Sequence, residues 1–96
     1  MDLALFRHLL AQPESERLEF KEWKRKGDLD ALCRYCCALA NEGGGHFILG
    51  VTDRRPRKIV GTTVFAALDE TAAQVRAKLG IEVRADQLRV DFKRVV

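Results

Sequence analysis

Residues 41–53, with the sequence NEGGGHFILGVTD, connect an expected helix end to an expected buried strand. The apolar run at residues 47–51 is continuous and is bounded by turn-forming residues, which is typical of a strand buried on both faces. The glycines at 43–45 separate this strand from a preceding segment whose apolar residues recur at helical spacing. We therefore expect a helix, a sharp glycine turn and a buried strand. The apolar stripe of that helix comprises Leu29, Leu32, Cys33, Cys36, Leu39 and Ala40.

The segments before this helix predict a strand and a further helix. Residues 2–11 carry apolar side chains at helical spacing, and Pro13 ends the run. Residues 18–21 alternate apolar and polar side chains, which is the period of a half-buried strand. Gly27 and Asp28 then supply a break and an N-cap for the central helix.

After the buried strand, the pattern predicts a hairpin, a helix and a last strand. Residues 59–61 are the expected return strand of the hairpin. Residues 68–79 form the expected helix, and Gly80 is placed to be the left-handed residue that follows it. Alternation from Val90 onward predicts one terminal strand. The fold class is therefore mixed α/β (α+β), a small mixed β-sheet with two or three packed helices.

Length and composition predict one small cytoplasmic domain, residues 1–96. A chain of 96 residues has room for one core, and no segment approaches the roughly 20 apolar residues of a membrane span. Three cysteines cannot all pair within one chain, and the N-terminus lacks the basic region of a signal peptide. The last strand reaches Val96 without a turn or cap, so we expect the domain to continue beyond it.

The basic residues are concentrated in two short clusters. Residues 1–53 carry 7 basic and 9 acidic side chains, whereas residues 54–96 carry 10 basic and 5 acidic ones. Such clusters suit phosphate contacts, although short basic runs are also ordinary solvated loops. Outside the five phenylalanines, only Trp23 and Tyr35 are aromatic candidates for base stacking. The candidate phosphate-binding residues are Lys24, Arg25, Lys26, Arg54, Arg55, Arg57 and Lys58.

The glycines and cysteines are interpreted as structural residues. Gly43, Gly44 and Gly45 follow the C-terminus of a helix, where the macrodipole repels anions, and no Gly-Lys-Ser/Thr follows. A P-loop is therefore excluded, and a left-handed cap with a sharp turn is expected; the alternative is close approach of a ligand to the flexible loop. Cys33 and Cys36 fall on the apolar stripe, and no second cysteine pair completes a zinc site.

The carboxylates offer a second candidate site. Glu14 and Glu19 lie in and before the strand at 18–21, and a sheet could bring Asp53 near them. Three converging carboxylates suit Mg²⁺ or Mn²⁺, which can polarise a phosphodiester, and Lys21 could neutralise developing charge. Acidic residues that flank a strand are, however, usually only solvated.

The motifs together resemble the Schlafen AlbA-like domain from about residue 14 to the end of the chain. The resemblance implies a mixed α/β fold, frequent self-association, and DNA binding in a bacterial regulator that often continues into ATPase-like or winged-helix regions. In nuclease members, two glutamates and an aspartate form a metal-dependent RNA-cleaving site. The motif match places these roles on Glu14, Glu19 and Asp53, with Lys21 beside them. The motifs are ESERLEFK at 14–21, CALANEGG at 37–44, ILGVTD at 48–53 and VG at 60–61.

The sequence differs from the usual pattern of this family in three respects. A basic RRPRK segment at 54–58 replaces the short Asp-Gly-type turn of many members, and the glycine loop carries an additional Gly45. The family's further C-terminal strand and Pro-containing segment, expected after Val96, are absent.

Three functions are consistent with the sequence. The first is a nucleic-acid-binding module, with DNA or RNA as partner and no membrane association. The second is a metal-dependent endoribonuclease that uses Glu14, Glu19 and Asp53 with Mg²⁺ or Mn²⁺. The third is a dimerisation or interaction module, a homodimer in which the glycine loop and the last strand meet another chain.

Overall fold

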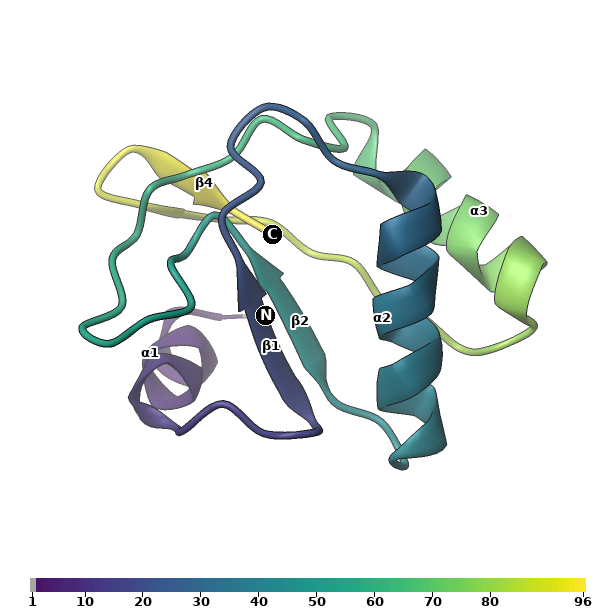
Figure 1. The fold of residues 1–96 in the computed structure, drawn as a ribbon. Coiled ribbons are helices and arrows are strands. Elements are labelled where there is room, and N and C mark those ends of the chain that lie inside the picture. The colour runs from purple at the N-terminus through teal and green to yellow at the C-terminus, as the bar shows by residue number, and fades with distance from the viewer. Residues whose placement is uncertain (1) are drawn as a thin grey trace.

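The fold is built on two parallel strands joined by a helix, in a computed structural model that describes residues 2–96. Strands β1 (Leu18–Lys21) and β2 (His46–Leu49) pair from Leu18↔His46 to Lys21↔Leu49, and α2 (Leu29–Asn41) makes the crossover between them (Figure 1). A parallel pair needs such a crossover, because the second strand must start again at the same end of the sheet. The elements in chain order are α1 (Leu3–Ala11), β1 (Leu18–Lys21), α2 (Leu29–Asn41), β2 (His46–Leu49), α3 (Leu68–Leu79), β3 (Leu88–Val90) and β4 (Lys93–Val95).

Both ends of α2 follow the sequence prediction. The Asp28 carboxylate accepts a hydrogen bond from the Asp30 amide at 2.9 Å, which confirms the N-cap. At the other end, the amides of Gly43 and Gly44 donate to the carbonyls of Ala40 and Leu39 at 3.0 and 2.9 Å. Gly43 has a φ of +88°, so this Schellman arrangement is the predicted left-handed cap.

Gly45 is required by a close approach of the chain's own backbone. A Cβ atom at Gly45 would lie 2.3 Å from the carbonyl oxygen of Arg17, just before β1. The same carbonyl accepts a hydrogen bond from the His46 amide at 2.9 Å. The glycine loop therefore starts the β1–β2 pairing.

The predicted hairpin after β2 is reduced to one bridge. β2 ends at Leu49 rather than at residue 51, because Gly50 has a φ of +94° and turns the chain out of the strand. Val51 then makes a single antiparallel bridge with Ile59. The amides of residues 60 and 61 both donate to the Gly50 carbonyl, at 2.8 and 3.0 Å, so no regular return strand forms at 59–61.

The predicted single terminal strand is wrong, since the chain turns back on itself. β3 and β4 form an antiparallel hairpin whose two turn residues, Asp91 and Phe92, have φ values of 50° and 65°. Positive φ at both positions is the geometry of a type I′ turn. The sequence did not predict this turn because Asp-Phe lacks the glycine that is typical of such turns. Val96 then exchanges two hydrogen bonds with Leu49, at 2.8 and 3.1 Å, so the end of the chain lies beside β2.

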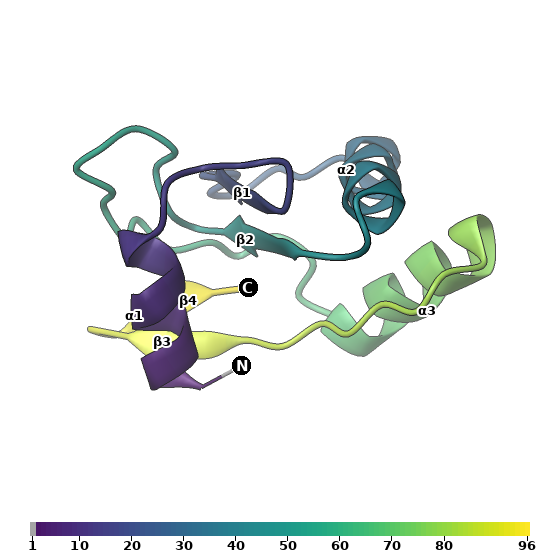
Figure 2. The same cartoon turned by 90° about the horizontal axis from the view of Figure 1, so that it is seen from below.

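The burial expected on both faces of the second strand holds for its last two residues, because Ile48 and Leu49 are buried while Phe47 is half-buried and His46 is exposed. Figure 2 shows α1 and the β3–β4 hairpin at one end of the molecule and α2 with α3 at the other. On the α2 side, Cys33 is buried and Cys36 is half-buried, which agrees with the core-packing interpretation of the cysteines. Across residues 2–96, no helix is long and apolar enough to span a membrane. The main core comprises Phe6, Leu9, Leu18, Phe20, Ile48, Val51 and Val95.

Candidate functional site

The outer face of β1 carries an ion pair. Alternate strand residues point to opposite faces, so Leu18 and Phe20 enter the core while Glu19 and Lys21 face the other way. Lys21 Nζ lies 3.5 Å from Glu19 Oε1, and the two side chains are 29% and 21% exposed. This half-buried pair is the centre of the predicted carboxylate site.

Glu14 and Asp53 come to the same place from other parts of the chain. The pKa of the Glu14 carboxyl is raised, first by burial and next by the charge of Glu19 and a hydrogen bond with Glu19. The charge of Asp53 also raises this pKa, whereas the charge of Lys21 lowers it. A raised pKa is what two carboxylates that share a small space should show. The structure thus brings Glu19, Asp53 and Lys21 within electrostatic range of Glu14.

The carboxylates as arranged do not complete a metal centre. In the described part of the chain, no three His, Cys, Asp or Glu side chains gather closely enough to hold a metal ion. Glu14 and Glu19 form a hydrogen-bonded pair, whereas Asp53 acts on Glu14 only through its charge. The donor set therefore does not fit the three-ligand site that the motif implies, and we derive no metal-dependent step from it.

Tyr35 is a member of this site that the sequence did not indicate. Its ring lies 5.5 Å from Lys21 Nζ, a cation–π distance. Burial lowers the pKa of Lys21, but hydrogen bonds and charge interactions with Tyr35 and Glu19 outweigh it and hold the pKa above its ordinary value. Tyr35 lies off the apolar stripe of α2, so only the crossover geometry places it over β1.

The aromatic residues that we considered for base stacking are packed against one another. The ring of Trp23 lies 6.3 Å from Tyr35 and 5.6 Å from Phe47, and Tyr35 lies 4.8 Å from Phe47, measured between ring centroids. Trp23 and Tyr35 are half-buried in this cluster. The stacking role considered for these two residues therefore conflicts with their packing.

The basic loop at 53–58 is anchored to the C-terminus of α1. The guanidinium of Arg57 donates hydrogen bonds to the carbonyl of Leu10, at 2.8 Å, and to the carbonyl of Gln12. Its central carbon, Cζ, lies 4.1 Å from the centroid of the Phe20 ring. Arg55 donates to the carbonyl of Ala11 at 3.3 Å. Lysine and arginine suit a helix C-terminus, where carbonyls lack intrahelical partners. Arg57, which we predicted as a phosphate contact, therefore has an anchoring role inside the fold.

The remaining cations of the two clusters are exposed. Arg54 and Lys58 make no side-chain hydrogen bond or ion pair within residues 2–96. The carbonyl of Lys24 accepts a hydrogen bond from the Thr63 amide at 2.9 Å, which fixes the other loop while its side chains at 24–26 stay exposed. Figure 1 shows the loop at 22–28 arching toward α2 and the loop at 53–58 folding back beside α1, so the clusters occupy separate places.

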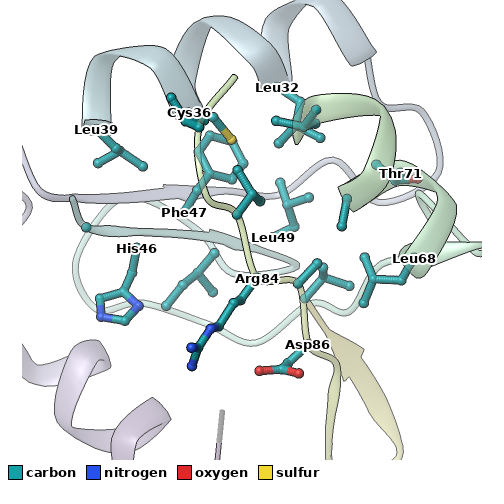
Figure 3. A pocket seen from close by; sticks show the side chains of 18 of the residues that line it. Leu32, Cys36, Leu39, His46, Phe47, Leu49, Leu68, Thr71, Arg84 and Asp86 are labelled. Atoms are coloured by element: carbon teal, nitrogen blue, oxygen red, sulfur yellow. The ribbon is translucent and has the colours of Figure 1, made fainter. Parts of the chain in front are cut away.

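A cavity of about 650 Å³ lies apart from the predicted catalytic and basic residues. Apolar side chains of α2, β2 and α3 line it, with His46, Arg84 and Asp86 among the polar residues at its border (Figure 3). Of the residues singled out from the sequence as site candidates, only Gly44 and Gly45 border this cavity. Burial, followed by the neighbouring Cys33, raises the pKa of the Cys36 thiol in its wall, which disfavours a thiolate ligand there.

Comparison with known proteins agrees with the motif positions. No curated protein and no solved structure matches the chain. A model of the protein family described as Schlafen, AlbA_2 matches residues 14–96, which is most of the chain and includes both the carboxylate site and the basic loops. With the parallel pair, the glycine cap and the Glu14–Glu19–Lys21–Asp53 group all inside the matched region, the chain belongs to the Schlafen AlbA_2 family.

Proposed function

We propose that this chain is a nucleic-acid-binding module that holds its ligand through phosphate contacts from exposed cations. The family points to a nucleic-acid-related role. The observation that carries the proposal is the anchored basic loop, in which Arg57 ties the segment to α1 while Arg54 and Lys58 extend into solvent. Because Arg57 fixes the loop before binding, the loop backbone loses little conformational freedom when Arg54 and Lys58 meet a phosphate backbone. Such contacts position a nucleic acid without reading its sequence.

The double variant Arg54→Ala/Lys58→Ala tests this loop. Each phosphate contact adds about 0.7–0.9 to the slope of log affinity against log salt, so the double variant should lower that slope by about 1.4–1.8. We expect affinity to fall on the order of tenfold at low salt, for all sequences alike. Fluorescence anisotropy with labelled single- and double-stranded DNA and RNA, between 50 and 200 mM salt, measures both quantities.

A charge-matched control removes two cations elsewhere on the molecule. Lys78 pairs with Asp30 at 3.1 Å and Arg84 lies 3.8 Å from Glu82, and all four side chains are exposed. Lys78→Ala/Arg84→Ala changes the net charge by the same amount, so it should leave the salt slope near the wild-type value. Equal slopes for the wild type and the Arg54→Ala/Lys58→Ala variant would show that the basic loop does not contact phosphate.

The same proposal covers the kind of protein that contains this module, its oligomeric state and its location. We infer that the module acts in a bacterial-type transcriptional regulator, as a homodimer, in the cytoplasm, and that an ATPase-like or winged-helix region belongs to the full-length protein. DNA is the first candidate ligand, and the parallel RNA titrations decide between the two.

The alternative is an endoribonuclease centred on Glu14, Glu19, Lys21 and Asp53. Their convergence from distant parts of the chain supports it, and the incomplete ligand set places it second. If the alternative holds, labelled RNA incubated with Mn²⁺ or Mg²⁺ is cleaved, and Glu19→Gln abolishes cleavage while RNA binding is retained. Glu16→Gln is the matched control, since Glu16 is an exposed glutamate beside the turn that precedes β1. If RNA stays uncleaved with both metals, the endoribonuclease alternative is rejected and nucleic-acid binding is the remaining function.

A further inference from the structure

The tip of the β3–β4 hairpin holds a phenylalanine ring in water. Phe92 is 97% exposed, whereas Leu3 and Leu5, the other exposed large apolar side chains in residues 2–96, are 38% exposed. Its φ of 65° lies in the left-handed region, which a bulky side chain rarely adopts and which asparagine or glycine adopts easily. The hairpin thus presents an apolar ring at a position where the turn geometry favours a small polar residue.

The hairpin is fixed to the body of the protein, so the ring has a defined position. Arg94, in β4, donates to the carbonyls of Thr62, Val64 and Phe65 at 3.2, 2.8 and 3.0 Å. Lys93 Nζ donates to the carbonyl of Ile59, immediately after the basic loop, at 3.2 Å. These bonds hold β4 against the segment that leads out of loop 53–58.

The ring and the basic loop project from the same end of the molecule. In both Figure 1 and Figure 2, the hairpin tip and the loop at 53–58 extend toward the same side. Arg89 and Lys93 are exposed cations on either side of the tip, and they outnumber the one carboxylate, Asp91. This end therefore combines exposed cations with a flat apolar surface.

We propose that Phe92 stacks on an unpaired base of a single-stranded nucleic acid whose phosphates lie along the basic loop. The inference rests on the proposed function and names its ligand class. Cations beside an accessible aromatic ring form a surface typical of single-strand binding, because every base offers a face for stacking. The bases of an intact duplex already stack on one another, so the ring gains little from a duplex. Phe92 also supplies the stacking residue that the packed Trp23 and Tyr35 do not.

Phe92→Asn separates binding from folding. Asparagine suits the left-handed turn position, so the variant should fold at least as well as the wild type, by circular dichroism and urea denaturation. Stacking of one base on an aromatic ring contributes about tenfold or more to affinity, so we expect single-strand binding to weaken by about that factor. Phe92→Tyr keeps the ring and should bind like the wild type. Leu3→Ala, which shortens an exposed apolar side chain on α1, should not change binding.

The titration uses a labelled 12-nucleotide oligonucleotide as DNA and as RNA, each also as a duplex. The expected result is a loss confined to the single strands, with an unchanged salt slope, because stacking releases no counterions. Equal single-strand affinity for Phe92→Asn and the wild type would overturn the stacking proposal and leave the binding function intact. An equal loss on the duplexes would also overturn it. Wild-type protein that binds no oligonucleotide would overturn the proposed function itself. A change of oligomeric state in Phe92→Asn, measured by light scattering, would assign the ring to a protein contact instead.

Discussion

Replacing Phe20 with alanine is expected to lower the free energy of unfolding by about 3–5 kcal/mol. Phe20, in β1, is fully buried in the main core, which also contains Phe6 and Leu9 of α1. The substitution removes the transfer free energy of the ring and leaves a cavity that the neighbouring side chains fill only in part. It also removes the surface over which the Arg57 guanidinium lies, at 4.1 Å from the ring centroid. Because small domains have a total stability of about 5–15 kcal/mol, this loss is a large fraction of the whole.

Urea denaturation followed by circular dichroism measures this loss. Phe92→Ala is the matched control, since it makes the same chemical change at a ring that is 97% exposed and should alter the free energy of unfolding by at most about 1 kcal/mol. Comparable losses for the two variants would show that the core does not lie where the structure places it.

Replacing Arg94 with alanine is expected to lower the free energy of unfolding by about 2–4 kcal/mol. The guanidinium supplies hydrogen bonds to three main-chain carbonyls at 62–65 and a fourth, at 2.7 Å, to Gln87. Burial, and next the charge of Arg89, lower the pKa of Arg94, which is consistent with a cation drawn partly out of water. Without it, carbonyls in the half-buried segment after the basic loop lose their donors, and the β3–β4 hairpin loses its side-chain hydrogen bonds from Arg94 to that segment.

Arg89→Ala is the matched control, because Arg89 lies directly opposite Arg94 in the hairpin register and its side chain is exposed. We expect that variant to differ from the wild type by no more than about 0.5 kcal/mol. Arg94→Lys keeps the charge but cannot reproduce the planar fork, so it should recover less than half of the lost stability. Full recovery in Arg94→Lys would show that charge, and not the set of carbonyl contacts, is what matters at this position.

These two residues illustrate different degrees of predictability. The alternation of residues 18–21 places Phe20 on the buried face of a strand, and the structure confirms it. Arg94 carries no comparable signal, because its partners lie 29–32 residues earlier in the chain. Arg57 likewise carries no local signal, because the Leu10 carbonyl to which it donates lies 47 residues earlier in the chain. A residue predicted from its basic cluster to bind phosphate therefore anchors the C-terminus of α1.

The elements that could be predicted from the sequence are those whose stabilising interactions are local. Asp28 and Gly43 fix the ends of α2 through hydrogen bonds within a few residues, and side-chain periodicity defines the core faces of α2 and β1. The candidate carboxylates could also be named in advance, from the motif that contains them. Such signals act over one or two turns of chain, which is why they can be read without a fold.

The contacts between distant segments became known only from the tertiary structure. It turned the last strand into a hairpin, reduced the return strand after Gly50 to one bridge, and packed Trp23 and Tyr35 together while leaving Phe92 exposed. It also brought Glu14 and Asp53 to the β1 ion pair. The physical reason is that each buried carbonyl, ring or charge must find a partner in space, and the partner's place in the sequence is unconstrained. Local sequence preferences therefore predict the helices and strands of this chain, whereas the partners that buried groups require determine how these elements pack together.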